Sequence, residues 1–155
     1  MVGATVLRRL RWFEDAYAAA PDVTTQTIRA LVSYVVPGRE SATRPLIRTL
    51  DRFLPGPVPL SATAATILNE YAKQVDPRSA KFAAPFARLS KANKDRVFAT
   101  VASLPVESAG SIQFLVGNLP DLAAFLAYSA PSSYRLSRYS GVSNGRKELK
   151  GYWHA

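Results

Sequence analysis

The chain has 155 residues, of which 48% are hydrophobic and 20% charged, and this composition is typical of one folded domain. It has no cysteine and one histidine, which leaves almost no material for disulfides, histidine or thiolate metal sites, or catalytic triads. The formal net charge of +9 favours an anionic partner, without choosing between nucleic acid, a membrane surface and an acidic protein.

Three helices are predicted in the first part of the chain, because apolar residues recur there at helical spacing. The first is expected over residues 5–20, with a stripe at positions 6, 10, 13 and 17. The second follows a cap at Thr24 or Thr25 and stops at Pro37-Gly38, and the third begins near Thr43. The inward side chains expected for the second and third helices are Ile28, Leu31, Val32, Val35, Leu46, Ile47, Leu50, Phe53 and Leu54.

The stiff segment 55–59 then connects to a fourth helix, which is predicted to have its cap at Ser61 and to end before Asp76-Pro77. A short helical or irregular segment with Phe82, Phe86 and Leu89 follows, and Ser90 is predicted to cap a fifth helix. The inward side chains expected in the fourth and fifth helices are Ala64, Ile67, Leu68, Tyr71, Val75, Val97, Phe98, Val101 and Leu104.

The sixth helical segment contains Pro120, which has two interpretations. Either this proline kinks one long helix, or Asn118 caps a new one. The side chains expected to face inward on this segment are Ile112, Leu115, Val116, Leu119, Leu122, Phe125, Leu126 and Tyr128. No stretch alternates with a period of two, so we expect an all-α fold: a single helical domain of about six helices, residues 1–130, with an irregular tail, residues 131–155.

The sequence offers little for catalysis. There is no glycine-rich phosphate loop and no Glu-x-x-His ligand pair, and the acids are scattered along the chain. No apolar run approaches the ~18 residues of a membrane-spanning helix. We therefore expect a chain that is not an enzyme, with no cofactor, no metal and no transmembrane segment of its own.

The C-terminal tail combines aromatic and basic residues with glycines that break regular structure. Disordered tails are normally poor in aromatic residues, and Tyr, Trp and Arg are the residues that anchor interfaces. The tail is therefore predicted to dock on a partner, although its rings could instead fold back onto the chain's own helices. The partner-binding residues expected here are Tyr134, Arg138, Tyr139, Arg146, Tyr152 and Trp153.

Several short motifs carry a family resemblance: Thr27–Pro37, Phe86–Ser90 with Asp95-Arg96-Val97, Phe125–Tyr128, Arg138–Gly141 and Leu149–Tyr152. Their layout resembles the small subunit, also called gamma subunit or subunit 3, of membrane-associated gluconate 2-dehydrogenases. The resemblance implies no cofactor in this chain and a tight, larger partner. That partner would be an FAD-dependent oxidoreductase of the glucose–methanol–choline type, whose folding, stability or export the small subunit supports.

The expected function is thus that of a non-catalytic accessory subunit that binds and stabilises a larger FAD-dependent oxidoreductase. The alternative is a basic helical nucleic-acid-binding protein, because the tail interleaves basic residues with rings. Family members often carry a twin-arginine export signal, but Arg8-Arg9 lacks the apolar region that such a signal needs. A cytoplasmic location is expected, with export to the periplasm together with the partner as the alternative.

Overall fold

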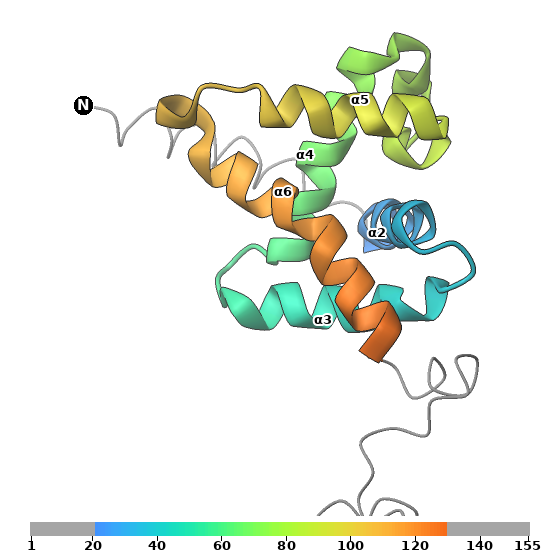
Figure 1. The fold of residues 1–155 in the computed structure, drawn as a ribbon, viewed down its shortest axis with the longest axis vertical. Coiled ribbons are helices and arrows are strands. Elements are labelled where there is room, and N and C mark those ends of the chain that lie inside the picture. The colour runs from blue at the N-terminus through green and yellow to red at the C-terminus, as the bar shows by residue number, and fades with distance from the viewer. Residues whose placement is uncertain (1–20, 130–155) are drawn as a thin grey trace, which may run out of the picture.

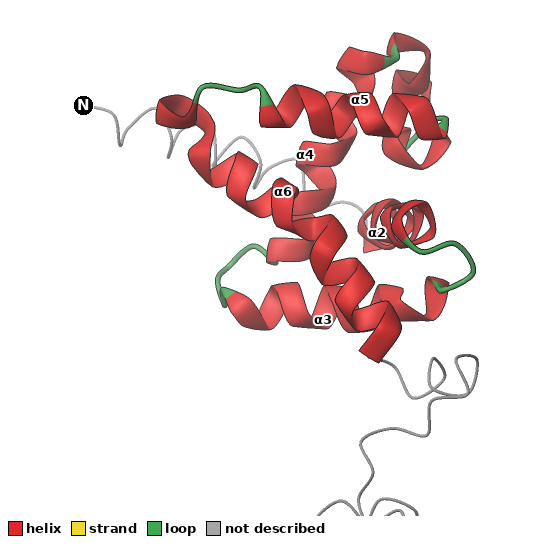
Figure 2. Ribbon diagram, viewed as in Figure 1, coloured by secondary structure: helices red, strands yellow, loops and turns green. Residues whose placement is uncertain are grey.

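The computed structural model describes residues 21–129, and every regular element in this part of the chain is helical (Figure 2). The α-helices are α2 (Pro21–Val35), α3 (Thr43–Phe53), α4 (Leu60–Val75), α5 (Lys91–Ala102) and α6 (Val106–Ser129). Three 3-10 turns join them: η1 (Glu40–Ala42), η2 (Pro77–Lys81) and η3 (Pro85–Arg88). The predicted all-α class is confirmed for the described range, and the helix expected over residues 5–20 lies outside it.

The helix α4 occupies the middle of the arrangement, where it packs against α2, α3 and α5. The longest helix, α6, lies against α2 and α5 and crosses over α3 (Figure 1). The two turns η2 and η3 pack on each other and on α4. The result is one helical unit with a shared interior, in which α6 has one side on the other helices and one side toward solvent.

The interior is formed by aliphatic side chains from every α-helix and by one ring from η3. The fully buried members include Ile28, Leu31, Val32, Leu46, Leu68, Phe86, Val97 and Val116. Most of the predicted inward positions of α2, α4 and α5 are buried or half-buried, as expected from their spacing. Burying each such side chain contributes roughly 1.5–3 kcal/mol, which makes this cluster the main source of stability in the described part.

Two of the predicted helix caps are wrong. The helix α2 already begins at Pro21, so Thr24 and Thr25 lie inside it rather than before it. In α4, Ser61 is the second residue, and its backbone N–H donates to the Asp51 carboxylate at 3.0 Å. A side chain from α3 thus satisfies a free donor of the next helix, a task that the sequence assigned to a local serine.

The cap at Ser90 is confirmed, because its side chain accepts a hydrogen bond from the Asn93 N–H at 3.3 Å. The stop after α2 is confirmed as well. Gly38 follows Pro37 with a φ of +78°, a conformation that glycine adopts without steric cost and other residues rarely adopt. These two helix ends were predicted correctly because the residues that form the cap and the turn are neighbours of the helix end in the sequence.

The ambiguity at Pro120 is resolved in favour of one helix. The element α6 is continuous over 24 residues with Pro120 inside it, and Asn118 does not cap a new helix. Instead, the Asn118 side-chain amide donates to the Phe114 carbonyl at 2.6 Å, one turn back. Because α6 is continuous, the helical period determines which of its residues share a face.

Four side chains that were predicted to face inward are exposed: Phe53, Leu54, Phe125 and Tyr128. Phe53 is the last residue of α3 and Leu54 follows it, so both lie beyond the end of the interior that Leu46 and Leu50 contact. Phe125 and Tyr128 lie on the side of α6 opposite to its buried residues. In both cases the apolar pattern was present, but no described element covers it.

Candidate functional site

All six residues predicted to bind the partner lie outside the described residues, so the prediction for the tail is untested. They are Tyr134, Arg138, Tyr139, Arg146, Tyr152 and Trp153. The described chain ends at Ser129, the last residue of α6. The surface that leads into the tail is therefore α6 itself, and its outward face is the strongest candidate site in the described part.

The outward face of α6 carries three large aromatic side chains with most of their surface in solvent. Phe114 is 66% exposed, Phe125 65% and Tyr128 62%. They stand at positions i, i+11 and i+14, and at 100° per residue these positions fall within about 60° of one another around the helix. They therefore form one row, with Phe125 and Tyr128 about one turn apart and Phe114 about 16 Å farther along the helix axis. Exposed apolar side chains that share a face mark a candidate binding surface.

The opposite face of α6 is made of smaller side chains that are buried: Val116, Leu119, Ala123 and Ala127. This face packs toward α2 and α3, where small residues allow the helices to approach closely. The large rings are thus on the side that no described element contacts. The sequence interpretation assigned Phe125 and Tyr128 to the core and did not predict that Ala123 and Ala127 would be buried there.

Two acids and a glycine complete the outward face. Glu107 and Asp121 are exposed and fall within about 20° of Phe114 around the helix axis. A Cβ placed on the nearby Gly117 would meet nothing within 4 Å, so the surface beside the ring row is open. A partner for this face would present apolar pockets for the rings and a cationic group near Asp121.

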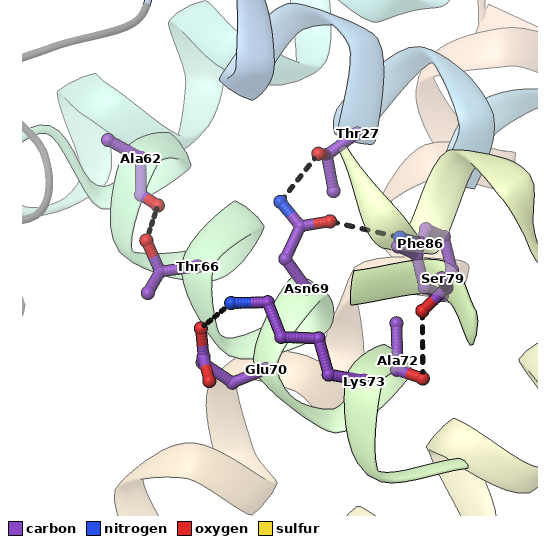
Figure 3. A network of polar contacts seen from close by, with 9 residues as sticks. All are labelled: Thr27, Ala62, Thr66, Asn69, Glu70, Ala72, Lys73, Ser79 and Phe86. Atoms are coloured by element: carbon purple, nitrogen blue, oxygen red, sulfur yellow. Dashed lines mark hydrogen bonds and ion pairs between the residues drawn. The ribbon is translucent and has the colours of Figure 1, made fainter. Parts of the chain in front are cut away.

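A network of buried polar groups lies in a different region, between α2, α4 and η3 (Figure 3). The Asn69 side chain donates to the Thr27 hydroxyl at 3.0 Å and accepts from the Phe86 backbone N–H at 3.0 Å. Within residues 21–129, every buried side-chain nitrogen or oxygen has a hydrogen-bond partner. This network holds η3 against two helices. It could not be predicted from the sequence, because the three residues are far apart in the chain.

A second polar contact joins α2 to α5. The Tyr34 hydroxyl donates to the Asp95 carboxylate at 2.5 Å, and the Tyr34 ring stacks on Phe98 with centroids 5.7 Å apart. Burial, together with the hydrogen bond to Asp95, raises the pKa of Tyr34 to about 12. The phenol therefore stays protonated at neutral pH, where it acts as a hydrogen-bond donor between the helices.

A search of the described residues for groups of three or more histidine, cysteine or acidic side chains that could hold a metal ion finds none. In the same range, no helix combines the length and the apolar character needed to cross a bilayer. Comparison of the chain with protein-family models, with curated proteins and with solved structures finds no match in any of the three.

Proposed function

We propose that the chain is a non-catalytic binding subunit that attaches to a larger protein through the outward face of α6. The observation that supports this most is the uncovered row of Phe114, Phe125 and Tyr128. Aromatic side chains are enriched among the residues that dominate interface energies, because they bury a large area with few rotors to fix. Nothing else on the described surface gathers as much exposed aromatic area on one element.

The tail would extend the same surface. Residue 130 follows directly on α6, so the tail begins at the end of the helix that carries Tyr128. A partner that covers the aromatic row would then meet the tail at the end of the helix. In this proposal the row supplies one half of the interface and the rings and arginines of the tail supply the other.

We further propose that the partner is a larger FAD-dependent oxidoreductase of the glucose–methanol–choline type, and that the flavin and the chemistry lie on that chain. The support for this identity is the resemblance of the motifs to the gluconate 2-dehydrogenase small subunit. We place the complex in the cytoplasm, with the periplasm as the alternative that cell fractionation would distinguish.

The test is purification of the tagged full chain from its native cells at moderate salt, followed by identification of the proteins that elute with it. The proposal predicts a second, larger chain in near-equal amount, with a bound yellow flavin. A stoichiometric partner without flavin would contradict the oxidoreductase assignment but not the binding function. The recovery of the chain alone from cells that express it at its normal level would contradict both.

A further inference from the structure

A second surface, remote from the C-terminal end of α6, gathers positive charge where η2, η3 and the start of α5 meet (Figure 1). Six basic residues fall between positions 78 and 96: Arg78, Lys81, Arg88, Lys91, Lys94 and Arg96. All are exposed except Lys94, which is half-buried. Arg96 falls about 160° from Lys94 around α5 and so points away from the other cations. We call the surface formed by the remaining five the basic corner.

The basic corner has an excess of positive over negative side chains. Only Asp76 and Asp95 occur between positions 76 and 96, and both are used in internal hydrogen bonds. Asp76 accepts from the Arg78 backbone N–H at 3.0 Å, and Asp95 accepts from the Tyr34 hydroxyl. The one ion pair found within residues 21–129, between Lys73 and Glu70, lies outside the corner. Both carboxylates keep their charge, so six cations and two anions leave a formal net charge of +4 over positions 76–96.

One exposed ring stands among these charges. The Lys81 ammonium lies 5.2 Å from the centroid of the Phe82 ring, and the Arg88 guanidinium carbon lies 5.1 Å from the same centroid. Phe82 is 38% exposed, and Lys94 lies 5.5 Å from the neighbouring Phe86 ring. Two like charges are thus held on one ring, an arrangement that a bound anion would stabilise by bridging them.

We propose that the basic corner binds single-stranded nucleic acid, with phosphates on Lys81 and Arg88 and a base stacked against Phe82. Cations that follow a backbone, interleaved with an exposed ring, are the combination that single-strand binding uses. The site goes beyond the protein-binding function of α6, because it uses different elements and a different kind of contact. It also differs from the tail, the segment on which the sequence first suggested nucleic-acid binding.

The test measures the binding of the full chain to a fluorescein-labelled single-stranded 20-mer by anisotropy, at several salt concentrations. The double variant K81Q/R88Q is expected to bind about tenfold or more weakly at low salt. It is also expected to lower the magnitude of the salt slope by about 1.4, because each lost phosphate contact contributes about 0.7. F82L is expected to weaken binding about fivefold or more without changing the slope, since it removes the stacking surface alone.

The matched control is R44Q/R48Q, which removes the same charge from exposed positions of α3 and should leave affinity within about twofold. Equal losses in K81Q/R88Q and R44Q/R48Q would overturn the proposal, because only the net charge would then matter. Inorganic polyphosphate that competes as well as the oligonucleotide would overturn the assignment to nucleic acid. Binding to vesicles with anionic lipid but not to the 20-mer would identify a membrane surface instead. Circular dichroism melting of each variant separates these outcomes from misfolding.

Discussion

The two faces of α6 differ in composition, because its aromatic rings stand on the face that the described residues leave uncovered, together with Glu107 and Asp121. The inward face packs Val116, Leu119, Ala123 and Ala127 into the core, while the outward face carries Phe114, Phe125 and Tyr128. The comparison shows that one face of this long helix packs in the core, while its exposed rings remain available for the partner that we propose. Mutations can therefore test two roles independently: the stabilising role of the inward face and the proposed binding role of the outward face.

The largest expected effect on stability comes from the inward face. Leu119→Ala should lower the free energy of unfolding by about 3 kcal/mol, because it removes buried methyl groups and leaves a cavity. Phe125→Ala, on the same helix but exposed, should change it by less than about 0.5 kcal/mol. Urea denaturation of both variants measures the difference. Equal losses would show that the Phe125 ring is covered by another part of the chain.

The buried polar network gives the next effect. Asn69→Ala leaves the Thr27 hydroxyl and the Phe86 backbone N–H buried without their partner. The free energy of unfolding should therefore fall by about 2 kcal/mol. Thr66→Ala is the control, because its hydroxyl only returns to the Ala62 carbonyl of its own helix. A loss for Asn69→Ala no greater than for the control would mean that η3 is held by packing alone.

The contact between α2 and α5 predicts a smaller effect that depends on pH. The pKa of Tyr34 is raised in the folded state to about 12 from its ordinary value of 10.0, so folding favours the protonated phenol. Its contribution is complete below pH 10 and is lost as the pH rises toward 12.

Tyr34→Phe keeps the stack on Phe98 but loses the hydrogen bond, and it should cost about 1 kcal/mol at neutral pH. Thermal melting between pH 9 and pH 12 should therefore show a steeper fall for the wild type than for the variant. Parallel curves for the two proteins would rule out the Tyr34–Asp95 bond as a source of stability.

The smallest expected change in stability comes from a glycine beside the outward face of α6. Gly117→Ala should raise the free energy of unfolding by about 0.5–1 kcal/mol, because alanine is the better helix former and its Cβ meets open space. Gly110→Ala is the comparison, since a Cβ there comes into ordinary contact with the Val106 side chain at 3.6 Å. A destabilised Gly117→Ala protein would show that a part of the chain outside the described residues packs closely on this face.

Much of the fold could be predicted from the sequence, because helix ends and apolar stripes are local signals. The Ser90 cap, the Pro37-Gly38 stop and the large aliphatic core positions of α2, α4 and α5 were expected from neighbours in the chain, whereas buried residues such as Ala65, Asn69 and Ala72 were not. The cap on α4 was missed because Asp51 supplies it from another helix. Spacing alone gives the apolar residues of a helix, but it does not say which of them will find a neighbour.

At the candidate site, too, apolar spacing did not show which side chains would be buried. Phe125 and Tyr128 were recognised as apolar helix positions and assigned to the core, and Phe114 was not singled out at all. The heptad-like spacing of Phe114, Asp121 and Tyr128 was the available signal, but it has meaning only once α6 is known to be continuous through Pro120. The Asn69 network had no sequence signal, since its members meet only in the folded chain.

The function that we propose for the outward face of α6 is the binding of a protein partner. The most direct measurement compares the chain, the triple variant F114S/F125S/Y128S and the control F53S, which makes the same change at an exposed ring of α3, in capture from native cell extract. Each anchoring ring is expected to contribute about thirtyfold in affinity, from ~2 kcal/mol per ring. We expect the chain and F53S to retain the same stoichiometric partner. We expect the triple variant to lose that partner while its melting midpoint stays unchanged. Retention of that partner by a folded triple variant would contradict the claim.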